Sequence, residues 1–289
     1  GAITLSSDGT SLLLGGSAVG GADLYTANAS TPTANTVTGS NSVAIGENLT
    51  VSGDNSLASG TGGTATGYSS FAFGDGADAT GNHSVAIGGG AIQASGAQSI
   101  AIGYGSDATN TDAHAFGRNA NASGSSATAL GRDAVASTTR AVALGDSRAN
   151  GVDSLAAAIA NNTSSYGATG ANSIAMGYQA KATGNKSVCI SQESIASGSN
   201  SVVIGGYGNV ADATYSFASG QYADTKSIFG KMARANGRFS ATGDAQSGTF
   251  VLRSDTTDAT AEPMTTANTP TSSLNITQIV VPSNAAFAF

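Results

Sequence analysis

The chain has 289 residues and a net charge of −7, and it contains 40 glycines, 4 prolines, one cysteine and no tryptophan. Because 40% of its residues are hydrophobic and no run of about 18 apolar residues occurs, its composition excludes both ordinary disorder and a transmembrane helix. The acidic balance argues against non-specific binding to nucleic acid, so we expect no nucleic-acid partner and no membrane insertion.

Residues 1–36 precede the periodic part of the chain. The stretch Ile3–Leu14 predicts a β-hairpin, because Asp8-Gly9 is a favoured pair for a tight turn between two strands. Residues 27–35 are rich in Ser, Thr, Asn and Pro, which is typical of a linker. We therefore expect residues 1–36 to be an N-terminal hairpin and linker that joins the next domain to a segment upstream.

Residues 37–221 carry a repeat of the form Ser-apolar-Ala-apolar-Gly, of which Ser42–Gly46 is the clearest copy. The twelve intervals between its thirteen copies are 14 residues in eight cases, 15 in two, and 13 and 19 in one each. A second glycine often stands seven residues before the first, as Gly39 and Gly53 do. The closing position of the repeat falls at Gly46, Gly60, Gly74, Gly88, Gly103, Gly117, Gly131, Gly145, Ala158, Gly177, Ser191, Gly205 and Gly220.

A unit of this length suits two short strands and two tight turns, because each half-repeat alternates with period two. The glycines stand where turns need positive φ or close approach of two backbones. We therefore predict an all-β chain forming a parallel β-solenoid with about 14 residues per coil; at about 4.8 Å per coil, thirteen coils would make a rod roughly 60 Å long. The irregular residues 159–169 are predicted to form a loop outside it.

The alternation also predicts self-association. A narrow coil holds only small side chains, so we expect Ser42, Ala44, Ser84, Ala86, Ala101, Ala143, Ala175 and Cys189 to point inward. The large neighbours must then point outward as an unbroken apolar stripe, which a monomer rarely leaves in water. The predicted interface comprises Val43, Ile45, Phe71, Phe73, Val85, Ile87, Ile100, Ile102, Phe116, Leu130, Val142, Leu144, Ile174, Met176, Val188, Ile190, Val202 and Ile204.

The segments Asn41–Gly46 and Gly198–Gly205 resemble the head repeats of bacterial trimeric autotransporter adhesins, the YadA-like left-handed β-roll. The resemblance covers about residues 37–221 and implies a left-handed roll and a parallel homotrimer. Three departures are visible: Ala158 and Ser191 replace the closing glycine, and Leu57-Ala58-Ser59 lacks the second large residue.

Residues 222–289 are expected to form a small C-terminal β region, and strands are predicted at Thr249–Arg253, Ile276–Val281 and Ala285–Phe289. The stretch from Gly237 to Gly248, together with Val251–Arg253 and Thr256–Thr260, resembles a segment that follows such rolls in tail-fibre-like proteins of bacteriophages, cyanophages among them. Because Phe289 stops within a strand pattern, we expect the native chain to continue. The basic residues of 226–238 are expected to pair with acids such as Asp224 and Asp244.

The titratable residues form no recognisable catalytic or metal site. His83 and His114 occupy different positions of the repeat, and Cys189 stands where other coils have alanine, so we interpret it as a small buried side chain. Asp75 and Asp78 lack the further oxygen ligands that calcium needs. We therefore predict no catalytic, metal-binding or cofactor-binding residues, and no cofactor.

Three functions remain open. The first is a structural and adhesive fibre of a bacteriophage virion, a tail fibre or spike, with other virion tail or fibre proteins and a host cell-surface polysaccharide or protein as partners. The second is the head of a bacterial trimeric adhesin on the outer surface of a bacterium. The third, a polysaccharide-degrading β-solenoid spike, is disfavoured because the repeats hold Asp and Glu singly rather than in pairs. We therefore expect a non-enzymatic homotrimer.

Overall fold

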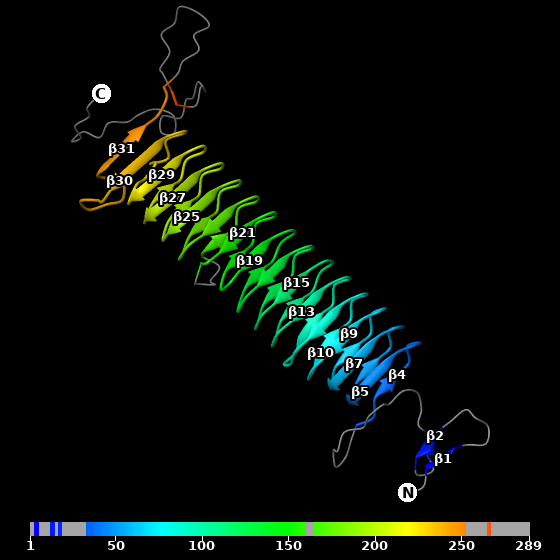
Figure 1. Cartoon of the computed structure of the whole chain (residues 1–289). Helices are drawn as coiled ribbons and strands as arrows, with labels where there is room; N and C mark the ends of the chain where they lie inside the picture. The colour runs from blue at the N-terminus through cyan, green and yellow to red at the C-terminus, as the bar shows by residue number, and fades with distance from the viewer. Residues whose placement is uncertain are drawn as a thin grey trace, which may run out of the picture. The chain divides into compact units, whose positions relative to one another are not determined.

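The computed structural model divides into two compact units, residues 1–140 and 141–289. Figure 1 labels many of the strands in each unit. All regular elements within the described ranges are β-strands, and no helix occurs among them. Strands of successive coils pair in parallel about 14 residues apart, so the predicted all-β parallel β-solenoid is confirmed. The described ranges are residues 3–5, 12–14, 17–18, 33–159, 165–252 and 265–266.

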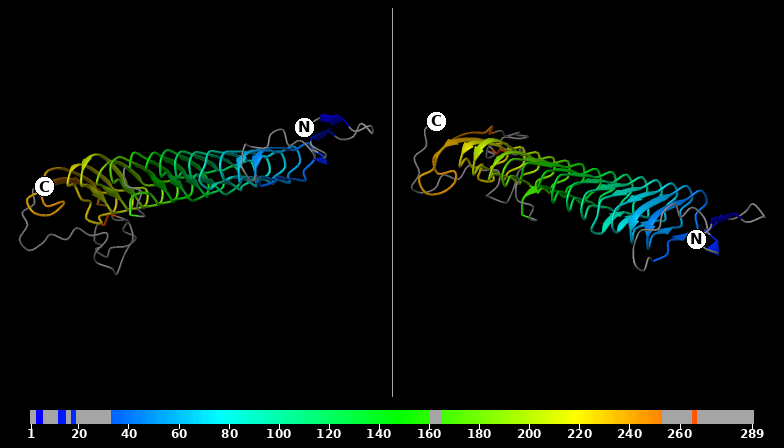
Figure 2. Two further views of the ribbon diagram at one scale, coloured as in Figure 1. Left: turned by 90° about the horizontal axis from the view of Figure 1, so that it is seen from below. Right: turned by 60° about the horizontal axis from the view of Figure 1, so that its bottom comes forward.

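In the first unit each coil contributes one strand to each of two sheets, here named sheet I and sheet II (Figure 2). Sheet I contains β5 (Val43–Glu47), β7 (Leu57–Thr61), β9 (Phe71–Phe73), β11 (Val85–Ile87), β13 (Ile100–Ile102), β15 (His114–Phe116) and β17 (Thr128–Leu130). Sheet II contains β4 (Thr36–Val37), β6 (Thr50–Val51), β8 (Thr64–Ala65), β10 (Ala77–Ala79), β12 (Ile92–Ala94), β14 (Asp107–Ala108), β16 (Asn121–Ala122) and β18 (Val135–Ala136).

The second unit has the same two-strand coil. Its sheet I contains β19 (Val142–Leu144), β21 (Leu155–Ala157), β23 (Ile174–Met176), β25 (Val188–Gln192), β27 (Val202–Tyr207), β29 (Phe217–Gln221), β30 (Met232–Asn236) and β31 (Gln246–Thr249). Its sheet II contains β20 (Arg148–Ala149), β22 (Gly167–Ala168), β24 (Lys181–Ala182), β26 (Ile195–Ala196) and β28 (Val210–Ala211).

The interior of the coils is filled mainly by alanine and serine. All eight residues that were predicted to point inward are buried, and Ala86, Ala101 and Cys189 are fully so. The expectation that the interior takes only small side chains is wrong at a few positions, such as Leu49 and Ile92. The end of the Ile92 side chain lies where a Cβ on Gly88 would stand, so this glycine leaves room for the larger side chain.

Left-handed backbone at residues other than glycine forms the corners of the coils. Asn55, His83 and Arg140 have φ of 57°, 58° and 54°, and none of the described non-glycine residues with positive φ is β-branched. The N–H of Asn55 donates to the carbonyl of Ser40 in the preceding coil, at 2.8 Å. Bonds of this kind satisfy the corner backbone and offset the cost of the left-handed conformation.

Both glycine series of the repeat allow successive coils to approach closely, and the closing series also needs positive φ. The closing glycines, such as Gly46 with φ of 136°, adopt backbone that side chains rarely allow. Gly67, from the second series, does not have positive φ, but a Cβ there would overlap the carbonyl oxygen of Gly81 in the next coil. The second series is therefore required by close approach of successive coils.

The segments on either side of the repeats agree with the predictions from the sequence only in part. β1 (Ile3–Leu5) pairs antiparallel with β2 (Leu12–Leu14), as a hairpin requires, and β3 (Ser17–Ala18) pairs with β2. β30 continues sheet I in parallel after β29, and β31 then returns antiparallel to β30. The domain boundaries at 36/37 and 221/222 stay predictions.

Two predicted segments are corrected. The strand predicted at Thr249–Arg253 lies earlier in the chain, because β31 ends at Thr249. Thr249 pairs with Met232, the first residue of β30, so β30 offers no partner for the residues that follow Thr249. The predicted loop 159–169 ends in β22, since Ala168 pairs with Ala149 of the preceding coil. The predicted strands at 276–281 and 285–289 lie outside the described residues.

Candidate functional surfaces

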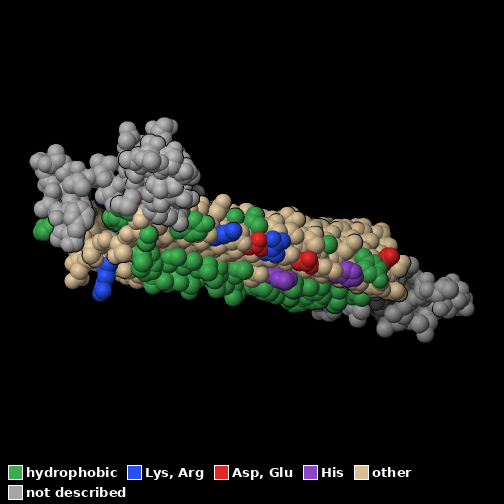
Figure 3. All heavy atoms as spheres, turned by 90° about the horizontal axis from the view of Figure 1, so that it is seen from above, with side chains coloured by type: hydrophobic (Ala, Val, Ile, Leu, Met, Phe, Trp, Pro, Cys, Tyr) green, Lys and Arg blue, Asp and Glu red, His purple; other side chains and the backbone are tan. Residues whose placement is uncertain are grey.

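Large apolar side chains stand on the outward side of sheet I in each unit (Figure 3). In β11, Val85 and Ile87 are partly exposed, whereas Ala86 between them is fully buried. All eighteen residues of the predicted interface occupy this outward side and are partly or largely exposed. We call this side the apolar face; its packing against other copies of the chain stays a prediction.

The apolar face is interrupted, so the expected unbroken stripe is wrong. His114 pairs with Ile100 in register and stands in the column of the large apolar residues, and Thr128 follows it. Ser59 interrupts the other column, between Ile45 and Phe73. The reason is that any side chain which can point outward from the coil satisfies the repeat locally, whether it is apolar or polar.

The individual residues that were considered for catalysis or metal binding have surroundings that belong to the fold. The centres of the His83 and Tyr68 rings are 5.4 Å apart, and the two rings meet edge to face. His83 is exposed and stands at a corner of the coil. Cys189 is fully buried, and its burial raises the pKa of the thiol to about 11. Asp78 accepts a hydrogen bond of 2.6 Å from the Thr64 hydroxyl. In the described part of the chain, no three His, Cys, Asp or Glu residues stand close enough to hold a metal ion.

The basic residues after 222 behave in two ways. Lys226 forms the predicted ion pair with Asp224, at 2.9 Å. The guanidinium of Arg238 instead stacks over the Tyr222 ring, 3.9 Å from its centre. The predicted pairing with Asp244 is not found there, because the Asp244 carboxylate accepts the backbone N–H groups of the turn that contains it. These residues therefore build a local turn.

Two titratable groups are sequestered near the end of the coils. Lys231 is almost fully buried, which lowers the pKa of its ammonium group, and its Nζ donates to the Asp224 carbonyl at 3.3 Å. Burial acts to raise the pKa of Asp212, but hydrogen bonds from Thr225 and Ser227 together outweigh it and lower that pKa. Both groups have partners that explain them as parts of the fold.

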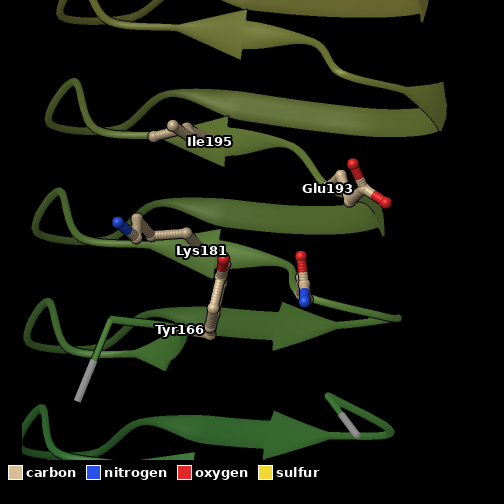
Figure 4. A pocket seen from close by; sticks show the side chains of 5 residues that line it. Tyr166, Lys181, Glu193 and Ile195 are labelled. Carbon is tan, nitrogen blue, oxygen red and sulfur yellow. The ribbon is translucent and has the colours of Figure 1, made fainter. Parts of the chain in front are cut away.

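A hollow of about 250 Å³ lies on the outward side of sheet II in the second unit. Figure 4 shows Tyr166, Lys181 and Ile195 on three successive coils, with Glu193 at the turn beside them. Gln179 completes the lining, and the Lys181 ammonium stands 5.7 Å from the centre of the Tyr166 ring. The sequence gives no signal for this hollow, because its residues come from different coils and share no motif.

Comparison with known families identifies the repeat. The YadA head domain repeat (2 copies) matches residues 34–62, 65–91, 94–120, 108–134, 122–147 and 168–188. No curated protein matches the chain. Within the described ranges, no helix has the length and apolarity needed to cross a membrane. Over the matched residues, the two-strand coils of this chain are similar to YadA head repeats.

Proposed function

We propose that the chain is a non-enzymatic attachment protein of the adhesin type that works as a homotrimer. The observation that carries this proposal is the apolar face, on which Phe73 is 51% exposed, Leu130 50% and Ile204 49%. Removing large apolar side chains of this kind from water contributes about 1.5–3 kcal/mol each. A face that repeats from coil to coil therefore favours obligate self-association.

The match to YadA head repeats favours three copies arranged in parallel. In closed cyclic symmetry every copy buries the same face, which suits a face that recurs at each coil. A trimer also presents three equivalent attachment sites, and linked sites raise apparent affinity by roughly 10²–10⁴ over one site. Attachment through several weak contacts fits a chain whose outward residues are mostly uncharged.

The same match supports the outer surface of a bacterium as the place of display. A second candidate is a fibre of a bacteriophage virion, attached to other tail or fibre proteins and reaching a polysaccharide or protein receptor on the host. The observation that favours it is the resemblance of residues 237–248, 251–253 and 256–260 to segments of phage tail-fibre-like proteins. Mass spectrometry of purified virions and of outer-membrane fractions distinguishes the two, since each location predicts the chain in one of these samples.

Sedimentation equilibrium of the full chain tests the trimer. We expect three times the chain mass of 27.9 kDa, and we expect a monomer when Phe73→Asp and Leu130→Asp place charges on the apolar face. The matched control is Tyr104→Asp, because Tyr104 is 63% exposed at a turn outside that face and its loss should leave the trimer intact. A folded wild-type monomer, or a trimer that survives the double substitution, overturns the proposal.

A further inference from the structure

The hollow on sheet II lies along one column of residues that face outward from successive coils. Arg148, Gly167, Lys181 and Ile195 follow one another in register on the outward side of β20, β22, β24 and β26. Gly167 is required by the packing of the coils, since a Cβ there would overlap the carbonyl oxygen of Arg148 in the preceding coil. The Tyr166 ring borders the hollow and Ile195 lies at its other end.

The polar groups of the hollow are held in place by neighbouring tyrosines. The Tyr207 hydroxyl donates to Glu193 Oε2 at 2.7 Å, and this bond raises the pKa of Tyr207 to about 12. Gln179 Nε2 donates to the Tyr178 hydroxyl at 3.2 Å. Gln179 and Glu193 both stand at corners with left-handed backbone, with φ of 52° and 48°. A ligand would therefore meet an amide and a carboxylate that each already hold one hydrogen bond to a tyrosine hydroxyl, which reduces the entropic cost of binding.

The combination of groups selects the chemistry of the ligand. An aromatic ring and an aliphatic side chain offer apolar contact, while the ammonium donates, the carboxylate accepts and the amide does both. Lys181 and Glu193 balance each other in charge, so the hollow favours neither an anion nor a cation. A pyranose sugar has an apolar C–H face for the ring, and its hydroxyl groups both donate and accept hydrogen bonds.

We propose that this hollow binds one neutral pyranose unit of a surface glycan, with its C–H face on Tyr166 and its hydroxyl groups bonded to Gln179, Lys181 and Glu193. The proposal deepens the attachment function and rests on it for its biological purpose, because it names the chemical class that the protein contacts. The hollow lies on sheet II, whereas the apolar face belongs to sheet I. Sugar binding and trimer formation can therefore be tested separately.

Saturation-transfer difference NMR on the full chain tests the site. The probes are the methyl glycosides of glucose, galactose, mannose and N-acetylglucosamine, with glucuronic acid as an anionic comparison. We expect saturation of the C–H protons of at least one neutral glycoside. Tyr166→Ala should weaken its binding about tenfold, because the stacking surface is lost. Tyr166→Phe should preserve binding, because the ring remains.

Tyr104→Ala is the matched control, since it removes an exposed tyrosine outside the hollow and should leave binding unchanged. Lys181→Met keeps the length of the side chain but removes the donor, so it should weaken binding even if Tyr166→Ala fails to fold. Absence of transfer to every neutral glycoside overturns the proposal, as does equal binding by the wild type, Tyr166→Ala and Lys181→Met, or a preference for glucuronic acid. Trimer mass and attachment to cells report on the proposed function independently of these results.

Discussion

Serine residues fill much of one interior column of the coils, and their hydroxyl groups differ in whether they are hydrogen-bonded. The Ser56 hydroxyl donates to the Gly67 carbonyl at 2.7 Å and accepts from the N–H of Ser70 at 3.0 Å. The Ser84 hydroxyl is equally buried but has no hydrogen-bond partner. Because Ala113 is fully buried at the same position two coils later, the column accepts a methyl group without other change.

This difference predicts opposite responses to the same substitution. Ser56→Ala should lower the free energy of unfolding by about 1 kcal/mol, because it leaves a buried carbonyl and a buried N–H without their partner. Ser84→Ala should leave that free energy unchanged or raise it, since it removes a buried hydroxyl that has no partner. Urea denaturation of the two variants measures both values. Equal losses for the two substitutions would contradict the assigned hydrogen bonds.

At the scale of the strands, the sequence predicts most of the fold. Period-two alternation is a local signal, so the strands of the repeat and the burial of Ala86 and Cys189 could be predicted from the repeats. The corners without glycine could not be predicted, because His83 and Arg140 adopt positive φ only where the neighbouring coil accepts their N–H groups. That stabilisation comes from tertiary contacts and leaves no mark in the local sequence.

Of the two candidate surfaces, one could be predicted from the sequence and the other could not. The apolar face could be predicted because alternate residues of one strand point to the same side. The hollow could not, because Tyr166, Lys181 and Ile195 meet only once the register of three coils is known. The loop predicted at 159–169 hides that register, because it includes Gly167 and Ala168, which form β22 and pair with β24.

The turn between β30 and β31 depends on one carboxylate. The N–H groups of Ala241 and Ser240, and then that of Phe239, donate to Asp244 and hold the pKa of its carboxyl below the usual value. A lowered pKa means that this stabilisation is complete above the unfolded-state pKa of about 3.9 and is lost as the pH falls through the lower folded-state value.

We therefore expect the Ala241 amide to be protected at neutral pH and to lose protection only below about pH 4. Hydrogen exchange of this amide, corrected for its intrinsic rate at each pH, measures the effect. In Asp244→Asn the side chain carries no charge, so the protection should be weaker and should not change across that range of pH. Loss of protection between pH 5 and pH 7 would show that another group controls the turn.

For the molecule as a whole, the coil is the unit of construction. Within the first unit each coil pairs only with the coil before it and the coil after it, as β15 does with β13 and β17. Stability then resembles a sum of terms for each coil and for each contact between neighbours, as in other repeat proteins. Gly117 and Gly131 close two successive copies of the repeat.

Deleting residues 118–131 should therefore preserve the fold, because it removes one complete coil and brings equivalent positions together. Deleting residues 118–124 removes half a coil, places the strand of sheet I where sheet II is required, and should abolish cooperative unfolding. Circular dichroism during heating compares the two deletions, and sedimentation compares their assembly. If the two deletion variants had the same melting temperature, a strand of sheet I could replace a strand of sheet II, which would contradict this prediction.

The burial of Cys189 has a practical consequence for reagents that modify thiols. It is the one cysteine in the chain, and with a pKa of about 11 only about one part in ten thousand is ionised at pH 7. Maleimide and iodoacetamide need the ionised form and access to the sulfur, so the native protein should stay unlabelled. A cysteine introduced at an exposed corner would then carry a dye or spin label alone, without prior removal of the natural thiol.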